Sequence, residues 1–280
     1  MERTLVTGAR GMLGRVLVEE LSDHCAVTCV DVGDFDITDE TLCMEALSAA
    51  APDIVINCAG YTDVDGAESH PQQAHAVNGT GAGNIARAAA AVGARLLHVS
   101  TEYVFDGSKD APYEVDDPTG PLNVYGASKL AGEQAVMTSG AEWTIVRTAW
   151  LYGHGGRNFV ETILRVAQER GWLEVVDDQR GAPTCAKDLA VVLRELAEKR
   201  SSGIVHATNS GQTTWFGFAQ AIVAAAGLTD VRVSPVATEG FPRPAVRPRN
   251  SVLSLARLRE ILGWEPRPWL PAVEEYIAER

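Results

Sequence analysis

The feature that most constrains the fold is a repeated alternation of short apolar runs with helical patterns through the first half of the chain. The runs are rich in Val, Ile and Leu, and they lie at 3–6, 26–31, 53–59, 94–100 and 143–148. Helical patterns occupy 12–21, 39–50 (behind Thr38 as the expected cap), 81–93 and 123–139. Such runs are typical of parallel strands buried on both faces, and the alternation indicates right-handed βαβ crossovers. The sequence therefore predicts an α/β fold with a Rossmann-type, doubly wound parallel sheet.

Beyond Trp150 the alternation becomes irregular. We expect helices near 157–170, 186–199, 214–226, 254–262 and 270–279, and short strands near 173–176, 204–207 and 231–234. The Pro-rich stretch at 241–250 cannot form a regular helix, because proline lacks a backbone donor. We predict a Rossmann domain at 1–150, to which later segments are free to return, and a smaller C-terminal α/β lobe at 151–280. Since ligands of open α/β sheets bind beyond the strand carboxyl ends, this lobe would close over a substrate.

The net charge limits the partners of the chain. Its 280 residues carry a formal charge of −13, and non-specific nucleic-acid binding needs clustered Lys and Arg. We therefore expect no nucleic-acid partner, and we expect any bound anion to be held by local groups.

The cysteines and the amino-terminal residues indicate a cellular location. The five cysteines form no CxxC pair or His-containing cluster, so we expect free thiols without zinc, and we place Cys29 and Cys58 in buried strands. The opening MERTLVTGARG lacks the pattern of a signal peptide, and no apolar run approaches the length of a membrane span. We expect a cytoplasmic protein with no membrane partner.

A glycine-rich turn, TGARGMLG at 7–14, lies between the first strand and the first helix. Gly8 would allow the tight turn, Gly11 a close approach of a pyrophosphate, and Gly14 close packing of the helix. Met12 and Leu13 would open the helix, whose amino terminus favours an anion. This context indicates dinucleotide binding, and the alternative is a merely structural turn.

Residues near this turn leave the identity of the dinucleotide open. Asp31 ends the second strand, where an acid binds the adenosine ribose, which favours NAD. Arg10 lies where a cation meets a 2′-phosphate, which favours NADP, unless it is only a solvated loop cation. We expect NADPH as the cofactor with NADH tolerated. Asp36 and Ile37 would cover the adenine, with a simple turn residue as the alternative for Asp36.

The stretch NVYGASKLAGE at 123–133 places Tyr125 and Lys129 at helical spacing. Positions i and i+4 share one helix face, so both polar groups can point at one spot. The stretch alone favours a surface pair. Its place after the strand at 94–100, in a sheet with a dinucleotide turn, instead favours an active site.

Several motifs occur in order along almost the whole chain: TGxxGxxG, STEYVFDG (100–107), PLNVYGASKLAGE (121–133), RTAWLYG (147–153), RNFVETIL (157–164), DDQRGAPT (177–184) and RPRNSVL (247–253). The glycine turn and YxxxK resemble the extended short-chain dehydrogenase/reductase superfamily. The complete set is similar to the dTDP-4-dehydrorhamnose reductase family, in which STEYVFDG and RPxNS are the more particular motifs.

The resemblance implies an NAD(P)H-dependent oxidoreductase of nucleotide-sugar metabolism. Its substrate would be dTDP-4-dehydro-6-deoxy-L-mannose, whose 4-keto group is reduced to give dTDP-L-rhamnose. Tyr125 would be the general acid, with its pKa lowered by the ammonium of Lys129 and by the nicotinamide ring. Lys129 would also bind the nicotinamide ribose, and the hydroxyl of Thr101 would hold the substrate carbonyl.

The resemblance implies further contacts. The nicotinamide side would be lined by Ala59, Gly60, Tyr61 and Thr62. The sugar nucleotide would be contacted by Thr62, Val64, Thr101, Glu102, Trp150, Asn158 and Arg247. Glu102 stands where the family usually has Asp, and a core tryptophan is the alternative for Trp150. Asn78, in an NGTG turn, would brace the active-site backbone or be a simple turn residue.

Two other functions remain open at this point. One is reduction of a different dTDP-4-keto-6-deoxyhexose in antibiotic sugar biosynthesis, and the other is a non-catalytic, cofactor-binding regulatory subunit on the same fold. We expect a monomer or a homodimer. Some family members dimerise through a metal held by acidic residues after the glycine turn, but Arg15 and Val16 follow Gly14 here, so we expect no metal.

Overall fold

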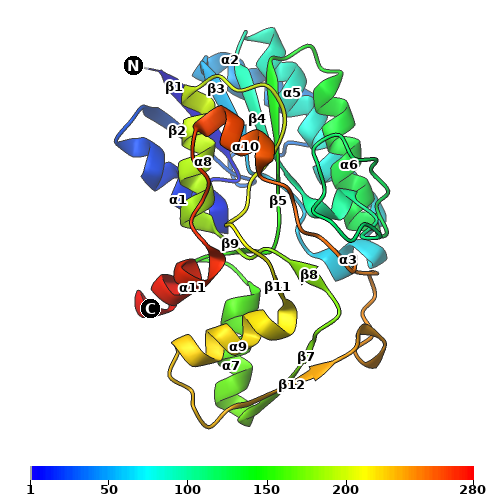
Figure 1. Cartoon of the computed structure of the whole chain (residues 1–280). Helices are drawn as coiled ribbons and strands as arrows, with labels where there is room; N and C mark the ends of the chain where they lie inside the picture. The colour runs from blue at the N-terminus through cyan, green and yellow to red at the C-terminus, as the bar shows by residue number, and fades with distance from the viewer. Residues whose placement is uncertain (1) are drawn as a thin grey trace.

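A computed structural model describes residues 2–280, and its centre is a six-stranded parallel sheet (Figure 1). The strand order is β10-β5-β4-β3-β1-β2, which confirms the predicted doubly wound α/β class. The strands are β1 (Arg3–Thr7), β2 (Ala26–Val30), β3 (Ile54–Asn57), β4 (Arg95–Thr101), β5 (Trp143–Thr148) and β10 (Gly203–His206). Because the strands are parallel, their carboxyl ends meet at one edge, where ligands of this sheet type bind.

Three helices cover each face of the sheet, and alternate strand residues pack against each set. One face carries α1 (Met12–Ser22), α8 (Ala186–Glu198) and α10 (Ala256–Leu262), packed on Val6 and its neighbours. The other face carries α2 (Glu40–Ala50), α5 (Ala82–Ala91) and α6 (Val124–Met137), packed on Leu5 and its neighbours. Adjacent residues of one strand are thus buried on opposite faces, which explains the unbroken apolar runs.

A second lobe lies beyond the carboxyl edge of the sheet, below it in Figure 1, and has an apolar core of its own. It contains α7 (Phe159–Arg170), α9 (Trp215–Ala225) and α11 (Trp269–Ala278). Short strand pairs complete it: β7 (Trp172–Val176) with β12 (Arg232–Val236), β8 (Arg180–Gly181) with β11 (Thr213–Thr214), and β6 (Leu151–Tyr152) with β9 (Thr184–Cys185). Between these elements the chain returns to the sheet with α8, β10 and α10.

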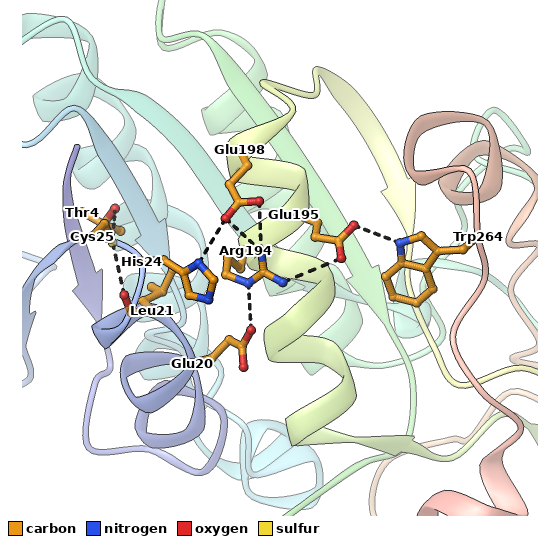
Figure 2. A network of polar contacts seen from close by, with 9 residues as sticks. All are labelled: Thr4, Glu20, Leu21, His24, Cys25, Arg194, Glu195, Glu198 and Trp264. Atoms are coloured by element: carbon orange, nitrogen blue, oxygen red, sulfur yellow. Dashed lines mark hydrogen bonds and ion pairs between the residues drawn. The ribbon is translucent and has the colours of Figure 1, made fainter. Parts of the chain in front are cut away.

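Polar contacts tie the returning helix α8 to α1 (Figure 2). Arg194 of α8 donates to Glu20 of α1 at 2.7 Å and to Glu198, one turn further along α8, at 2.8 Å. Trp264 donates its indole N–H to Glu195 at 2.9 Å. Two helices whose contact residues are 174 positions apart thereby cover one face of the sheet together.

Several local predictions were wrong. The cap of α2 is Asp39 rather than Thr38, since its carboxylate accepts from the backbone N–H of Thr41 and Leu42. The predicted NGTG turn is a π-helical segment, η1 (Ala76–Gly81), continuous with α4 (Pro71–His75) and α5. The helix α3 (Val64–Ser69) and the 3-10 turns η2 (Glu102–Val104) and η3 (Thr238–Gly240) were not predicted.

The thiols also differ from expectation. All five cysteines are free, but Cys29 is exposed and Cys58 is only half-buried. Cys29 lies on β2, which is the last strand of the sheet and pairs only through β1, so the expectation of a strand buried on both faces was wrong there. No helix within residues 2–280 is long and apolar enough to cross a membrane.

Candidate active site

A cleft of about 770 Å³ opens at the carboxyl edge of the sheet and reaches under the second lobe. Its walls come from the turns after β1, β2 and β3, the end of β4, the start of α6 and the residues after β5. Most residues that the sequence singled out line it: Gly8, Gly11, Met12, Leu13, Gly14, Asp31, Asp36, Ile37, Ala59, Gly60, Tyr61, Thr62, Val64, Thr101, Glu102, Tyr125, Lys129 and Trp150.

The glycine turn has a geometry that larger residues would break. Gly8 has φ +65°, and a Cβ added there would lie 2.8 Å from the backbone nitrogen of Ala59. A Cβ added at Gly14 would lie 2.1 Å from the carbonyl oxygen of Gly8. The turn is therefore tight, and α1 begins directly against it.

The amino terminus of α1 suits a bound phosphate group. Gly11 is its N-cap residue and offers no side chain to bond the first-turn N–H groups, and the first turn contains no acidic residue. These N–H groups and the helix dipole point toward the cleft, where a pyrophosphate would satisfy them. The residues present at this turn thus fit a dinucleotide.

Asp31 lines the cleft at the turn after β2, and Arg10 lies beside it without lining the cleft. The Asp31 carboxylate accepts from the backbone N–H of Arg10 at 2.7 Å and from that of Val32 at 2.8 Å. The Arg10 guanidinium extends to the carboxylate of Asp34 at 3.4 Å. A carboxylate and a cation are therefore both present beside the turn after β2.

Tyr125 and Lys129 lie on the first turns of α6, which Asn123 caps by accepting from the N–H of Gly126 at 2.8 Å. Lys129 is buried, and its ammonium donates to the carbonyl oxygen of Val99 at 2.7 Å. Burial lowers the pKa of Lys129 to about 8. A Cβ added at Gly126 would lie 2.2 Å from the carbonyl oxygen of Tyr103, so the small residue between Tyr125 and Lys129 allows close packing.

Thr101 and Glu102 face Tyr125 from the end of β4. The Thr101 hydroxyl donates to the Glu102 carboxylate at 2.6 Å, and both residues are buried. Burial raises the pKa of Glu102 to about 7. Burial, and then the charge of Glu102, raise the pKa of Tyr125, while polar contact with the Thr101 hydroxyl lowers it. The pKa of Tyr125 is thus raised in the protein on its own, and the lowering expected from Lys129 together with the nicotinamide ring stays a prediction.

Asn78 connects the nicotinamide side of the cleft to α6. Its amide oxygen accepts from the N–H of Tyr61 at 2.8 Å. Its amide nitrogen donates to the carbonyl of Tyr61 at 3.0 Å and to the hydroxyl of Ser128 at 2.9 Å. Asn78 therefore braces the backbone of the site, although it does so from a helix and not from a turn.

Trp150 forms the wall of the cleft under the second lobe. Its backbone has φ +47°, which bulky residues rarely adopt. Its ring stacks on that of Trp215 with centroids 3.5 Å apart, and its indole N–H donates to the hydroxyl of Ser251 at 3.1 Å. A Cβ added at Gly181 would lie 2.3 Å from this ring. The orientation of Trp150 is therefore determined from three sides.

Three singled-out residues, Arg10, Asn158 and Arg247, do not line the cleft as residues 2–280 define it. Asn158 caps α7 by accepting from the N–H of Glu161 at 3.1 Å, and it donates to two backbone carbonyls. Arg247 donates to both carboxylate oxygens of Asp65, at 2.6 and 3.0 Å. The polar groups of both residues are thus occupied within the protein.

Sequence reasoning missed several residues of the cleft, among them Phe35, Tyr103, Arg157 and Trp215. Tyr103 lies within the STEYVFDG motif and packs edge-on to Tyr125, with centroids 5.4 Å apart, so its motif was a usable signal. Trp215 opens α9 far along the chain, and nothing in its local sequence indicates the cleft. No group of three His, Cys, Asp or Glu that could hold a metal occurs in the described part of the chain.

A protein-family model described as RmlD substrate binding domain matches residues 1–280. Curated relatives include a dTDP-4-dehydrorhamnose reductase of Streptomyces griseus, 47% identical, with 98% of this chain and 92% of the relative covered. Another, of Mycolicibacterium smegmatis, has the same name and is 45% identical, with 99% of this chain and 85% of the relative covered.

A solved structure agrees with these sequence relatives. The dTDP-4-dehydrorhamnose reductase of Bacillus anthracis, in complex with NADP, superposes with a TM-score of 0.95. It is 38% identical, and the match covers 100% of this chain and 99% of that one. The similarity therefore extends over both lobes as well as over the glycine turn.

Proposed function

The chain belongs to the dTDP-4-dehydrorhamnose reductase family, and from that premise we propose that it reduces the 4-keto group of dTDP-4-dehydro-6-deoxy-L-mannose to give dTDP-L-rhamnose. It would act as an oxidoreductase with NADPH as its cofactor, as the NADP in its Bacillus anthracis relative suggests, and with NADH tolerated. One observation carries the proposal: a single cleft contains both the glycine turn and the set Thr101, Tyr125 and Lys129. A cofactor at the turn and a ketone at the set would then share one cavity.

The dinucleotide would be held mainly by the first three turns of the sheet. Gly8, Gly11 and Gly14, with Met12 and Leu13, would surround the pyrophosphate at the start of α1. Asp31, Asp36 and Ile37 would contact the adenosine portion, with Arg10 beside them. Ala59, Gly60, Tyr61 and Thr62 would line the nicotinamide portion, next to the Lys129 ammonium.

The bound reduced nicotinamide supplies the hydride for carbon 4 of the sugar. Tyr125 donates the proton that the developing alkoxide needs, giving the 4-hydroxyl. Burial keeps the phenol protonated near neutral pH, which is the form that donates. Lys129, close to the nicotinamide side, would bind the ribose and orient the ring.

The Thr101 hydroxyl would hold the substrate carbonyl. The protonation state of Glu102 would determine whether this hydroxyl is available. When Glu102 is ionised, the Thr101 hydroxyl donates to the carboxylate at 2.6 Å. When Glu102 is protonated, the carboxylic acid donates to Thr101 instead, and the Thr101 proton is free to bind the keto oxygen. Since the pKa of Glu102 is raised to about 7, both forms are accessible near neutral pH.

The sugar nucleotide would lie against the part of the cleft lined by Thr62, Val64 and Trp150. Asn158 and Arg247 stay predicted substrate residues, and contact with the nucleotide would require them to exchange their present partners. The cytoplasmic location, the monomeric or homodimeric state and a domain division at residue 150 also stay predictions.

A substrate panel tests the proposal. Purified protein is mixed with NADPH or NADH and a series of dTDP-4-keto-6-deoxyhexoses, and cofactor absorbance and product stereochemistry are followed. We expect the fastest cofactor oxidation with dTDP-4-dehydrorhamnose and NADPH, and dTDP-L-rhamnose as the product. Absence of cofactor oxidation with every member of the panel would disprove the proposal.

A further inference from the structure

The loop that joins β6 to α7, residues 153–157, packs on the first turn of α1. A Cβ added at Gly156 would lie 3.1 Å from the Cβ of Met12, and one added at Gly153 would lie 3.2 Å from its Cγ. Asn158 holds the loop closed by donating to the carbonyls of Gly153 at 2.8 Å and Gly156 at 3.2 Å. This loop of the second lobe is therefore set against the end of the glycine turn.

Arg157 ends this loop and lines the cleft together with Gly11 and Met12. It is exposed, and no ion pair or hydrogen bond of its guanidinium occurs within residues 2–280. The other cations near the turn are occupied: Arg10 pairs with Asp34 at 3.4 Å, and Arg15 donates to the carbonyl of Arg10 at 2.7 Å. Arg157 thus brings an unpaired positive charge to the cleft, and it does so from the loop that packs on the start of α1.

The surroundings make such a charge valuable for binding an anion. The chain carries a formal charge of −13, and three aspartates, Asp31, Asp34 and Asp36, lie on the turn after β2. The helix dipole of α1 offers only about half a positive charge, and a pyrophosphate carries two negative ones. Among the described residues that line the cleft, Lys129 and Arg157 alone are basic, and Lys129 is directed to the carbonyl of Val99.

We propose that Arg157 is a cofactor-binding residue supplied by the second lobe, and that its guanidinium binds the pyrophosphate held at the amino terminus of α1. The inference rests on the proposed function, because that function places a dinucleotide at this turn. The planar guanidinium binds phosphate oxygens through two parallel N–H groups. The pyrophosphate is then held from both lobes, and the tight packing of the loop on Met12 keeps the cation in reach.

The pyrophosphate is common to NADH and NADPH, and this determines the test. Full-length wild-type protein, Arg157→Gln and Arg157→Lys are titrated with each nucleotide in the absence of sugar nucleotide, with protein fluorescence as the readout. We expect Arg157→Gln to weaken the binding of both nucleotides by a similar factor, about tenfold. Arg157→Lys should recover part of the loss, because it keeps the charge without the planar fork.

Arg170→Gln is the matched control, since Arg170 is exposed at the far end of the adjoining helix α7. We expect this control to bind both nucleotides as the wild type does. Salt dependence gives a second readout: raising the salt concentration should weaken binding less in Arg157→Gln than in the wild type. Thermal unfolding of each variant checks that the exposed substitution leaves the fold intact.

Each remaining outcome has a definite meaning. Unchanged nucleotide binding by Arg157→Gln would overturn the inference and leave the proposed function standing. Weaker binding of NADPH alone, with NADH binding unchanged, would assign Arg157 to the 2′-phosphate, and this result would overturn the inference as stated. Failure of the wild-type protein to bind either nucleotide would instead overturn the proposed function.

Discussion

Sequence motifs predicted functional residues on both sides of the cleft, from the sheet and from the second lobe. In the structure the polar side chains of the two sides have different partners. On the sheet wall, Thr101, Tyr125 and Lys129 lie in the cleft, close to one another. On the side of the second lobe, Asn158 and Arg247 lie outside the cleft lining: Asn158 caps a helix, and Arg247 pairs with Asp65. The first set is arranged around a space, while the second holds segments of the chain together.

The difference follows from how each wall is built. The sheet wall comes from successive strand–helix units, so the end of β4 and the start of α6 lie together because the sheet is parallel. The second wall comes from segments near 150, 180, 215 and 250, whose approach depends on tertiary packing alone. A motif on the first wall therefore has a predictable position, while one on the second must be located in the structure.

The largest effect should come from Tyr125 on the sheet wall. Tyr125→Phe keeps the ring and its edge-on contact with Tyr103 but removes the only group we assign to proton donation. We expect kcat to fall by about 10³-fold with little change in KM, as measured by NADPH oxidation with dTDP-4-dehydrorhamnose.

Tyr103→Phe is the matched control, because this tyrosine lies against Tyr125 in the same cleft. We expect it to lower kcat less than about tenfold, within what a lost hydrogen bond explains. Equal losses in the two variants would mean that the hydroxyl of Tyr125 has no special chemical role, and the contrast between the walls would lose its mechanistic meaning.

Much of the sheet wall was predictable for physical reasons. Continuous apolar runs identified the five strands of the first half, and the helical spacing of Tyr125 and Lys129 placed both on one face of α6. Composition did not reveal the sheet order, which leaves β2 at an edge and exposes Cys29. The glycines of NGTG suggested a turn, but the segment stays helical between α4 and α5.

The second wall was predictable only in part. The helices α7, α8, α9 and α11 were predicted close to their observed bounds from their apolar periodicity. The approach of Trp215 to Trp150, however, joins residues 65 positions apart through a stack at 3.5 Å, and no local pattern indicates it. Whether an arginine has no ion-pair partner among residues 2–280, as Arg157 has none, or is paired, as Arg247 is, likewise depends on distant segments.

A second test concerns Glu102, whose burial in the sheet wall makes stability depend on pH. Its folded-state pKa is raised from 4.5 to about 7, so the folded protein binds the proton more tightly than the unfolded chain does. Its contribution to stability is therefore fully present below the unfolded pKa and is lost as pH rises through about 7. Relative to Glu102→Gln, we expect the wild type to lose roughly 2–3 kcal/mol of unfolding free energy between pH 5 and pH 8.

Urea unfolding of both proteins across this pH range measures the difference. Glu174→Gln is the control, since Glu174 is exposed on β7 and should leave the pH dependence of the wild type unchanged. If the wild type and Glu102→Gln showed parallel curves, Glu102 would titrate as an ordinary surface carboxylate, and the explanation for the availability of the Thr101 hydroxyl would fail.

The smallest expected effect concerns the side of the second lobe, through the Arg247–Asp65 pair, which lies outside the cleft lining. The pair is bidentate and its side chains are only 18% and 28% exposed, so a double-mutant cycle of Arg247→Gln and Asp65→Asn should give a coupling energy of about 1 kcal/mol in urea unfolding. Arg243→Gln is the control. The guanidinium of Arg243 lies 3.9 Å from Asp65 and the side chain is 54% exposed, so its coupling energy to Asp65 should be near zero.

If Arg247 acts by anchoring the 241–250 loop, both single variants, Arg247→Gln and Asp65→Asn, should raise KM for the sugar nucleotide by a similar small factor. A large KM increase confined to Arg247→Gln would instead make this arginine a nucleotide-binding residue. Side chains from both sides of the cleft would then bind ligand, and the contrast between ligand binding on one side and structural support on the other would fail.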